Sequence, residues 1–595
     1  MSDPSPSREL PSRLQALAFQ FKTRAFQLRR GVREFGRRPP RHPHGHALRD
    51  TPTASEARSP VWNQVAPAEF PLTAGKIENL RLAARALDGL EIPAGATFSF
   101  WRQLGRTTRR RGFTTGRELR EGCLVPSTGG GLCQLSGLLY QAALEAGLEI
   151  VERHAHSRIL PGSAAARGLD ATVFWNYVDL RFRAPFHWRL EVRLDASELV
   201  VRIRSAVPGG GKLRPPRPAA PPPPPATGDC LTCGQTECFR HPAATGSHAP
   251  SLGHSAYLLD PLWPEFDRWC AGHARAGDRW FLPLDGRRWN RPNYAWSPPA
   301  SATATHATLP TLLRSFRQRR LPAQGAARQA ALLAADAALA KYYANRISPE
   351  CRHLVVSQNL LPHLWRLGAL GGRTFDVLLA RWPLAELHRH LDAAARRNPS
   401  SPTLGDFRAD PDLVRDEAEA LDRAARLVTP HRALASRFGH RAWLVDWHLP
   451  DGLPRPAPPA GRPRLFLPCS PLGRKGIHEL AAALRGIDAE LLVLGRAREG
   501  GGADPLDGLD WRPATLDELA RCHALVLPAW VEHQPRPALR ALAGGIPVIA
   551  TEACGLPEHP QLLRIGRPDP DALAAAIVRA VGTSLDPEPE PALAP

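Results

Sequence analysis

Three consecutive glycines lead into a cysteine whose surroundings could support nucleophilic chemistry. Gly129, Gly130 and Gly131 precede Cys133, and residues 132–145 have the apolar pattern of a helix. A cysteine at a helix N-terminus meets unpaired amides and the positive end of the helix dipole, which favour the thiolate. The glycines allow close backbone approach and could supply oxyanion donors. The alternatives are a tight turn before a packed helix, and an anion-binding turn without chemistry.

Two histidines follow on a segment with strand-like alternation at 149–157. His154 and His156 should share one face of that strand, because side chains two residues apart point to the same side. Either could act as the base toward the cysteine, and Asp170 or Asp179 could orient it. The sequence therefore predicts a thiol–imidazole site, with the partner of the cysteine left open.

A second group of chemically active residues is a compact cysteine cluster. Its C-x2-C-x4-C spacing, followed by a histidine, is typical of a tetrahedral zinc site. The predicted ligands are Cys230, Cys233, Cys238 and His241, with His248 or Cys270 as an alternative fourth ligand. An iron–sulfur cluster is the second choice for the metal, and a reduced loop with chance cysteines is the alternative without one.

The elements that must position these residues fall into several domains, because proline-rich stretches interrupt the 595-residue chain. The expected parts are a basic amphipathic helix and linker at 1–60, an α+β domain at 61–207, a Pro-rich linker at 208–228, a Cys-rich insert at 229–250, a first α/β domain at 251–450, a hinge at 451–463, a second α/β domain at 464–583 and a tail at 584–595.

The α+β expectation for the first domain comes from two helical stretches followed by strand-like segments. Those segments lie at 149–157, 172–183, 188–194 and 199–204. The loop "DASE" joins the last two as a hairpin. In the C-terminal part, "LFLPCS", "ELLVLG", "ALVLPA" and "PVIAT" are short apolar runs, each followed by a turn or helix. That rhythm predicts parallel, doubly wound sheets with helices on both faces.

The N-terminal segment has apolar residues at helical spacing and arginines on its other faces. The apolar positions are Leu14, Leu17, Phe21, Leu28, Val32 and Phe35. Such a helix can lie on an anionic membrane surface, and the alternative is a helix docked on the protein's own body.

Composition gives weaker guidance about partners. The net charge is +20, but only five of the 77 basic residues are lysines, which indicates codon bias rather than a nucleic-acid surface. We expect no specific nucleic acid as partner. No run of eighteen apolar residues predicts a transmembrane helix, and arginines interrupt every candidate signal core. We therefore expect a cytoplasmic protein with reduced cysteines, peripheral to a membrane if the N-terminal helix binds one.

Four stretches of the first domain resemble the VanW family, in family order across 66–204. They are "NLRLAARALDGLEIPAGATFSFWRQLGRTTRRRGF", "GGGLCQLSGLLY", "VERHAHS" and "ATVFWNYVDLRFR". The resemblance implies a role in the cell envelope or in glycopeptide resistance, and supplies no reaction. It marks as site positions Gly129, Gly130, Gly131, Cys133, Gln134, His154, His156, Ser157, Asn176 and Asp179.

Residues 464–581 resemble the C-terminal domain of GT-B glycosyltransferases, especially the retaining family-four type. The motifs are "LFLPCSPLGRKGIHELAAAL", "LLVLG", "DELARCHALVLPAWVEHQPRPALRALAGGIPVIATEACGLPE" and "PDPDALAAAIVRAV". The resemblance implies that Arg474 and Lys475 neutralise the diphosphate of a nucleotide-sugar donor. It also places Gly555 at a helix start that meets a phosphate, and Glu532 near the sugar as the first acid of the E-x7-E motif.

The second acid of that motif is replaced here by Arg540, which cannot accept hydrogen bonds from ribose hydroxyls. The loop "EHQPRP" also replaces the glycine-containing loop usual in relatives. Our principal expectation is a VanW-like, envelope-related protein fused to a glycosyltransferase that moves a sugar from a nucleotide donor to an envelope acceptor. The alternative is a non-catalytic scaffold or binding protein with a degenerate transferase fold.

Overall fold

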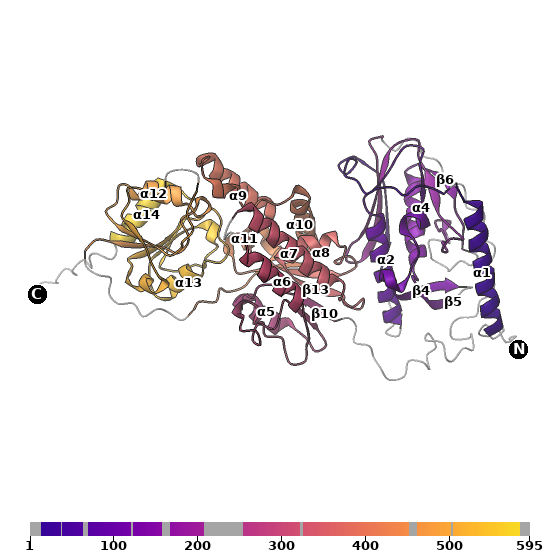
Figure 1. The fold of residues 1–595 in the computed structure, drawn as a ribbon, viewed down its shortest axis with the longest axis horizontal. Coiled ribbons are helices and arrows are strands. Elements are labelled where there is room, and N and C mark those ends of the chain that lie inside the picture. The colour runs from indigo at the N-terminus through magenta and orange to yellow at the C-terminus, as the bar shows by residue number, and fades with distance from the viewer. Residues whose placement is uncertain are drawn as a thin grey trace, which may run out of the picture. The chain divides into compact units, whose positions relative to one another are not determined.

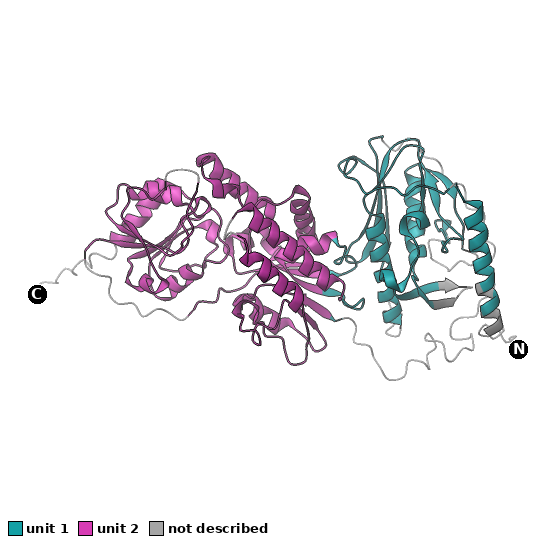
Figure 2. Cartoon of the chain, viewed as in Figure 1, with its two compact units in different colours: residues 1–254, 347–353, 367–374 teal, residues 255–346, 354–366, 375–595 magenta. Residues whose placement is uncertain are grey.

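The computed structural model separates into two compact units (Figure 2). Unit 1 comprises residues 1–254, 347–353 and 367–374, and unit 2 comprises residues 255–346, 354–366 and 375–595. The structure describes residues 13–36, 38–62, 69–120, 123–156, 167–207, 254–321, 325–450, 461–500 and 504–582. The cysteine cluster at 230–241, His248 and Ser157 lie outside the described residues.

Unit 1 is built on a four-stranded antiparallel sheet. In spatial order its strands are β1 (Thr53–Pro60), β9 (Glu198–Arg204), β8 (Trp188–Leu194) and β2 (Leu90–Ile92). The predicted hairpin of β8 and β9 is confirmed, and the amide of Asp195 donates to the carbonyl of Glu198 at 2.8 Å in its turn. The α+β class is therefore confirmed.

Two helices, α2 (Phe70–Leu87) and α4 (Leu132–Glu145), pack on strands of this sheet (Figure 1). In α2 the side chains of Ile77, Leu80 and Leu87 recur at helical spacing and are fully buried. The same spacing buries Leu135 and Leu139 of α4 in one hydrophobic core with them. This core fixes the start of α4, and with it the glycine turn.

A smaller sheet and a hairpin complete unit 1. The elements are β3 (Thr97–Ser99), β7 (Arg181–Arg183) and β6 (Glu149–Glu152) in one sheet, the β4 (Thr115–Arg120)–β5 (Cys123–Thr128) hairpin, and the short helix α3 (Phe100–Leu104). The strand expected at 149–157 ends at Glu152, since the amide of His156 donates to the Asp170 carboxylate instead of a strand neighbour. The strand expected at 172–183 is reduced to its last three residues, because Phe174 and Val178 close a tight turn.

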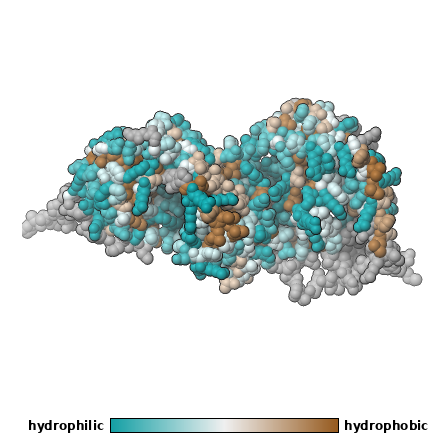
Figure 3. All heavy atoms as spheres, viewed as in Figure 1, coloured by the Kyte–Doolittle hydropathy of each residue, from teal (hydrophilic) through white to brown (hydrophobic). Residues whose placement is uncertain are grey.

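Helix α1 (Arg13–Arg33) docks on the body of unit 1 by one face. Gln27 donates to the carbonyl of Trp175 at 3.1 Å, and Arg30 forms an ion pair with Glu152 at 2.7 Å. On the opposite face apolar side chains remain exposed, and Figure 3 shows apolar surface along this helix. These exposed side chains are Leu17, Phe21, Leu28, Val32 and, just past the helix, Phe35.

The first domain of unit 2 contains a seven-stranded sheet with the order β12-β11-β10-β13-β14-β15-β16. Its strands are β10 (Ser255–Leu258), β11 (Arg279–Leu282), β12 (Thr303–His306), β13 (His353–Ser357), β14 (Thr374–Leu378), β15 (Arg426–Thr429) and β16 (Ala442–Leu444). Its helices are α5 (Pro264–His273), α6 (Thr308–Arg319), α7 (Ala326–Ala344), α8 (Leu361–Arg366), α9 (Leu384–Arg397), α10 (Pro411–Arg423) and α11 (Arg432–Phe438).

The second domain has a six-stranded parallel sheet with the order β19-β18-β17-β20-β21-β22. The strands are β17 (Arg464–Leu467), β18 (Glu490–Val493), β19 (Trp511–Pro513), β20 (Ala524–Leu527), β21 (Val548–Thr551) and β22 (Leu562–Ile565), and the helices are α12 (Ile477–Leu484), α13 (Arg536–Ala543) and α14 (Pro570–Gly582). The four apolar runs singled out in the sequence are β17, β18, β20 and β21, so the prediction of doubly wound parallel domains is confirmed.

In both domains the first strand lies between the second and the fourth, so the strand order reverses beside the first strand. Open α/β sheets bind ligands at the carboxyl ends of the strands at this switch point. None of the helices that the structure describes is both long and apolar enough to cross a membrane.

Candidate functional site

In the second domain of unit 2, two of the predicted site residues meet at the switch point. Lys475 ends the short 3-10 turn Gly473–Lys475 that follows β17, and Glu532 follows the neighbouring strand β20. The Nζ of Lys475 lies 2.8 Å from Oε2 of Glu532. Because β17 and β20 are neighbours in the sheet, two residues that are 57 positions apart in the chain form one ion pair.

Both members of this pair are charged, although their side chains are only 17% and 12% exposed. Burial lowers the pKa of Lys475, but the Glu532 carboxylate outweighs it and raises that pKa above its usual range. Burial likewise raises the pKa of Glu532, while the Lys475 ammonium lowers it to about 2. The ammonium also donates to the carbonyl of Val531 at 3.2 Å. Among the described residues, this leaves one of its three N–H bonds for a ligand oxygen.

Arg474 brings a second cation to the same turn. Its guanidinium lies 4.8 Å from the ring centre of Phe407, which belongs to the first domain of unit 2. Burial lowers the pKa of Arg474, and the carboxylates of Asp406 and Glu499 act against that shift. The turn therefore presents two adjacent cations in a partly dehydrated setting, where charge interactions are stronger than in water.

Sequence reasoning missed two histidines of this site. Burial lowers the pKa of His533 to about 3, and its Nδ1 is buried without a hydrogen-bond partner among the described residues. Burial also lowers the pKa of His431, to about 4, and its Nε2 lies 3.0 Å from the carbonyl of Ala553. The unusual loop "EHQPRP", which contains His533, was the available signal for that residue. His431 comes from the first domain of unit 2, and no local pattern pointed to it.

The expectation that Gly555 opens a helix is wrong. Gly555 follows the 3-10 turn Glu552–Cys554 with a left-handed φ of 57°, and its amide already donates to Glu552. A Cβ here would lie 2.2 Å from the His431 ring, and the carbonyl of Gly555 accepts from the indole of Trp447 at 3.0 Å. The glycine thus allows close packing between the two domains of unit 2.

Arg540 lines a different part of unit 2 from the ion pair. It lies on α13 and faces a cavity of about 270 Å³ together with Pro264 and His448 of the first domain. One turn earlier on α13, Arg536 forms a bidentate ion pair with Glu265, at 2.6 and 2.8 Å. The loop "EHQPRP" therefore leads into a contact between the two domains.

The first domain of unit 2 carries a buried polar cluster at its own switch point. Asp260 follows β10 and accepts from Asn359, after β13, at 2.6 Å and from Arg314 at 2.8 Å. Asp336 lies 3.6 Å from Arg314, and burial raises the pKa of Asp336 to about 7. Its Oδ1 is buried without a hydrogen-bond partner among the described residues. No local pattern in the sequence predicts this cluster, since four separate segments supply its side chains.

In unit 1, α4 begins at Leu132 as the sequence predicts, and Cys133 lies in its first turn. Gly131 caps the helix with φ of 100°, a left-handed conformation that favours glycine. A Cβ on Gly130 would lie 2.6 Å from backbone atoms of Gly116 in β4. The glycines are thus required by the turn itself, and the thiol of Cys133 is half-buried.

The structure selects His156 and Asp170 from the alternatives. The Nδ1 of His156 lies 2.8 Å from Oδ2 of Asp170. Hydrogen bonds with Asp170 and then with the side chain of Cys133 raise the pKa of His156 to about 9. Burial raises the pKa of Asp170, but the bonds from His156 lower it overall. Cys133, His156 and Asp170 therefore form one connected set.

The other two candidates lie elsewhere. His154 is exposed beside Glu152, at 3.3 Å, because the strand that would have aligned it with His156 has ended. Asp179 accepts from the hydroxyl of Ser99 at 2.6 Å and from Arg181 at 2.9 Å. Asp179 therefore does not orient the imidazole, and that alternative from the sequence is wrong.

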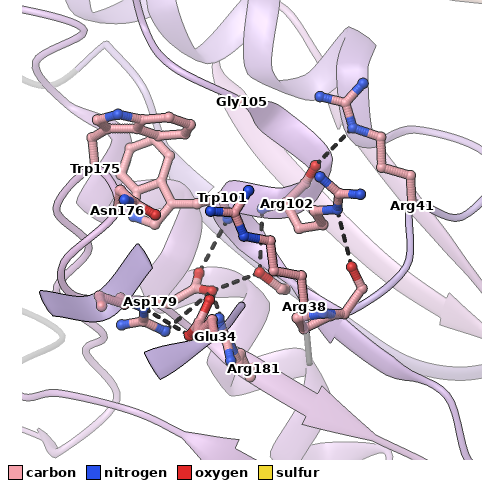
Figure 4. A pocket seen from close by; sticks show the side chains of 13 residues that line it. Glu34, Arg38, Arg41, Trp101, Arg102, Gly105, Trp175, Asn176, Asp179 and Arg181 are labelled. Atoms are coloured by element: carbon pink, nitrogen blue, oxygen red, sulfur yellow. Dashed lines mark hydrogen bonds and ion pairs between the residues drawn. The ribbon is translucent and has the colours of Figure 1, made fainter. Parts of the chain in front are cut away.

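Asp179 and Asn176 line a separate cavity of about 270 Å³ in unit 1 (Figure 4). Figure 4 shows Arg181 and Glu34 beside the Asp179 carboxylate, and the ring of Trp101 beside that of Trp175. Asn176 donates to the carbonyl of Gln27 at 3.2 Å. This cavity is lined partly by α1, so its polar residues also hold that helix.

Two family models match the chain. Residues 75–204 match the family described as VanW like protein, and residues 471–582 match the family described as Glycosyl transferases group 1. The first match contains the Cys133 set, and the second contains the Lys475–Glu532 pair.

Two curated relatives match the first region. One is the vancomycin B-type resistance protein VanW of Enterococcus faecalis, 34% identical over 133 residues, which are 22% of this chain. The other is the protein YoaR of Bacillus subtilis, 36% identical over 115 residues, which are 19% of this chain. The chain spans only 48% and 37% of the lengths of these relatives.

Solved structures similar to the chain include a sucrose-phosphate synthase from Thermosynechococcus elongatus, with 16% identity, a TM-score of 0.35, and coverage of 56% of this chain and 90% of that one. HepE from Anabaena, in complex with UDP and glucose, has 13% identity, a TM-score of 0.33, and coverage of 56% and 94%. On the two family matches, the chain carries a VanW-like domain in unit 1 and a group 1 glycosyl transferase domain in unit 2.

Proposed function

We propose that unit 2 transfers a sugar from a nucleotide-sugar donor to an acceptor of the cell envelope. The observation that carries this proposal is the buried pair of Lys475 and Glu532, with Arg474 beside it, at the switch point of the second domain. A nucleotide sugar carries a diphosphate as its leaving group, and two preorganised cations at a strand end suit that charge.

In the proposed reaction a hydroxyl oxygen of the acceptor forms a bond to the anomeric carbon, and the bond from that carbon to the diphosphate oxygen breaks. The hydroxyl proton leaves with the departing diphosphate. Arg474 and Lys475 offset the negative charge that develops, so they act more strongly in the transition state than in the ground state. Glu532 holds the ammonium in place. The resemblance to the family-four type supports retention of configuration.

The acceptor side is assigned to the first domain of unit 2. Asp336 has a pKa raised to about 7 by burial, so it can carry a proton and donate to a sugar hydroxyl. Asp260 and Asn359 lie with it at the carboxyl ends of neighbouring strands. The envelope as the source of the acceptor is supported by the resistance role in the name of the VanW relative.

We further propose that α1 brings the protein to an anionic membrane surface, where lipid-linked acceptors lie. Its exposed apolar stripe supports this, with Phe21 80% and Leu28 71% exposed on the face opposite the docked one. Arginines of the same helix would add attraction to anionic headgroups. A cytoplasmic setting stays a prediction from the sequence.

A non-catalytic scaffold is the second candidate. Arg540 favours it, because a guanidinium replaces the acid that would accept bonds from the donor's ribose. The two candidates differ in turnover. We would measure nucleoside diphosphate release by the full chain from a panel of nucleotide sugars, with calorimetry for binding.

If unit 2 is a transferase, the chain should bind a nucleotide sugar and hydrolyse it slowly, and both binding and hydrolysis should saturate with donor concentration. Lys475→Ala should lower turnover by about a hundredfold or more, the effect of losing one preorganised donor, and should weaken binding less. Lys341→Ala, at an exposed position of α7, is the matched control and should behave as the unaltered chain. Binding without turnover would support the scaffold, and no binding of any nucleotide sugar would contradict the transferase.

A further inference from the structure

Asp170 is held in a single orientation by bonds to both of its carboxylate oxygens. Oδ1 accepts from Nη2 of Arg153 at 2.7 Å. Oδ2 accepts from the amide of His156 at 2.7 Å and lies 2.8 Å from its Nδ1. This arrangement places the donor proton of the imidazole on Nδ1, so that Nε2 is the nitrogen left to face other groups. The carboxylate therefore fixes both the tautomer and the direction of the ring.

The segment around Asp170 is tied directly to the helix turn that carries the cysteine. The hydroxyl of Ser136 donates to the carbonyl of Ala171 at 2.5 Å. Gly137 allows the carbonyl of Leu169 to approach, since a Cβ there would lie 3.3 Å from that oxygen. These contacts lock α4 against the Asp170 segment, and the Cys133 thiol lies close enough to His156 to help raise the pKa of the imidazole.

Cys133 also differs from the other described cysteines. Cys270, Cys351, Cys522 and Cys554 are buried. Cys469 is half-exposed as a residue, but burial of its thiol raises its pKa to about 12. Among the described cysteines, the half-buried thiol of Cys133 has an imidazole partner, at the positive end of a 14-residue helix.

We propose that unit 1 carries a second activity, independent of sugar transfer: thiol-dependent cleavage of a carboxylic ester or amide through a thioester on Cys133. Cys133 is the nucleophile, His156 carries the proton, and Asp170 is the positioning residue for the imidazole. The same order of roles occurs in thiol and serine acyl-transfer enzymes on unrelated folds.

Near neutral pH the imidazole of His156 holds a proton on both nitrogens, because its pKa is about 9. In the first step the Sγ of Cys133, whose proton has already passed to Nε2 of His156, bonds to the carbonyl carbon of the substrate. The bond from that carbon to the leaving oxygen or nitrogen then breaks, and His156 returns the proton to the leaving group. Water completes the cycle. It gives a proton to His156, its oxygen bonds to the thioester carbon, and the C–S bond breaks to restore the thiolate and release the acid.

A purely structural role for the set would explain the bond between His156 and Asp170, but not its connection to a thiol at a helix N-terminus. The two roles are separated by acylation kinetics. The probe is 4-nitrophenyl acetate with the full chain, followed by nitrophenolate release and by mass spectrometry of the adduct. We expect an acetyl group on Cys133 that forms faster than on a free cysteine peptide at the same pH, and that water then removes.

His156→Gln should slow acetylation of Cys133 by about a hundredfold or more, the scale of positioned acid–base catalysis. Added imidazole should restore part of the rate, which a structural role would not allow. His154→Gln is the matched control, two residues away and exposed, and should leave the rate unchanged. The acetylation rate of Asp170→Asn should lie between the rates of His156→Gln and His154→Gln.

Equal acetylation rates in the unaltered chain and in His156→Gln would overturn the proposal. So would an adduct on another residue, or a Cys133 rate no faster than the free peptide. The comparison of the Cys133 rate with that of the free peptide needs no variant, so it tests the proposal even if His156→Gln fails to fold. Since none of these readouts involves a nucleotide sugar, failure here is distinct from failure of the transferase.

Discussion

The ammonium of Lys475 and the carboxylate of Glu532 lie 2.8 Å apart, and their side chains are only 17% and 12% exposed. A buried charge whose partner is removed is strongly unfavourable, whereas removing both charges together is far less so. The pair therefore links the stability of the second domain to the same charges that the proposed transfer uses.

Glu532→Gln alone should lower the free energy of unfolding by about 3–5 kcal/mol, because it leaves Lys475 buried without its counter-charge. The double variant Lys475→Met/Glu532→Gln should recover a large part of that loss. Urea unfolding of the single and double variants measures both. If the two losses simply add, the pair is not coupled, and its buried geometry is not what stabilises the domain.

Arg540 gives a test of donor recognition. If Arg540 has been recruited to the donor, Arg540→Glu should weaken nucleotide-sugar binding in calorimetry. If the guanidinium instead blocks ribose recognition, the same change should strengthen binding, because a carboxylate accepts two hydroxyl bonds. We expect weakening, because in the proposed transferase Arg540 would contact a part of the donor that extends beyond the ion pair into the cavity that Arg540 lines. Binding gained only by the variant would identify a retired transferase. Arg485→Glu, at an exposed position after α12, is the control for the charge change.

His156 should make the stability of unit 1 depend on pH. Its pKa is raised from 6.5 to about 9, first by the bond with Asp170. The protonated ring therefore adds stability fully below pH 6.5, and this contribution disappears as pH rises through about 9. The melting temperature of the unaltered chain should exceed that of His156→Gln near pH 6, and the difference should shrink by pH 10. A difference that grows with pH would contradict the raised pKa, and His154→Gln serves as control.

The apolar stripe of α1 should bind anionic vesicles. Phe21→Ser combined with Leu28→Ser removes two of its exposed side chains without touching the docked face. Co-sedimentation with vesicles containing an anionic lipid should then fall severalfold, and salt should weaken binding of the unaltered chain. Val578→Ser, at a side chain 61% exposed on α14, is the matched control. Unchanged sedimentation of the double variant would show that another surface makes the contact.

The cysteine cluster predicts a bound metal. Elemental analysis of the purified chain should find about one zinc per chain, or iron in its place, by the rule that three thiolates and an imidazole complete a tetrahedral site. Cys233→Ser should lose it, and Cys133→Ser should not. Equal metal content in both variants would remove the prediction. Among the residues that the structure describes, no three potential ligands gather as a metal site.

The features that could be predicted from the sequence are those set by residues close together in the chain. The start of α4 at Leu132 was predictable, because its glycine turn and apolar spacing are local. The parallel strands of the second domain were predictable for the same reason. The end of β6 at Glu152 was not predictable from the sequence. The amide of His156 donates to the carboxylate of Asp170, 14 residues later, and a hydrogen bond over that separation leaves no local pattern.

The sites follow the same rule. The sequence could name Cys133 and both histidines, but not choose between them, because the choice depends on which one Asp170 reaches. The cluster of Asp260, Arg314 and Asp336 was invisible for a stronger reason. Asp260 follows a strand, whereas Arg314 lies on α6 and Asp336 on α7, so the members meet only in the folded domain. Each one alone has the appearance of an ordinary surface charge.

The antiparallel pairing of β1 with β9 has a consequence for unit 1 as a portable module. The family match begins at residue 75, yet β1, at Thr53–Pro60, lies upstream of it and covers the edge of β9. A fragment cut at the family boundary would leave β9 with a bare hydrogen-bonding edge, a template for aggregation. A domain boundary set at residue 75 would therefore omit a strand that completes the edge of this sheet.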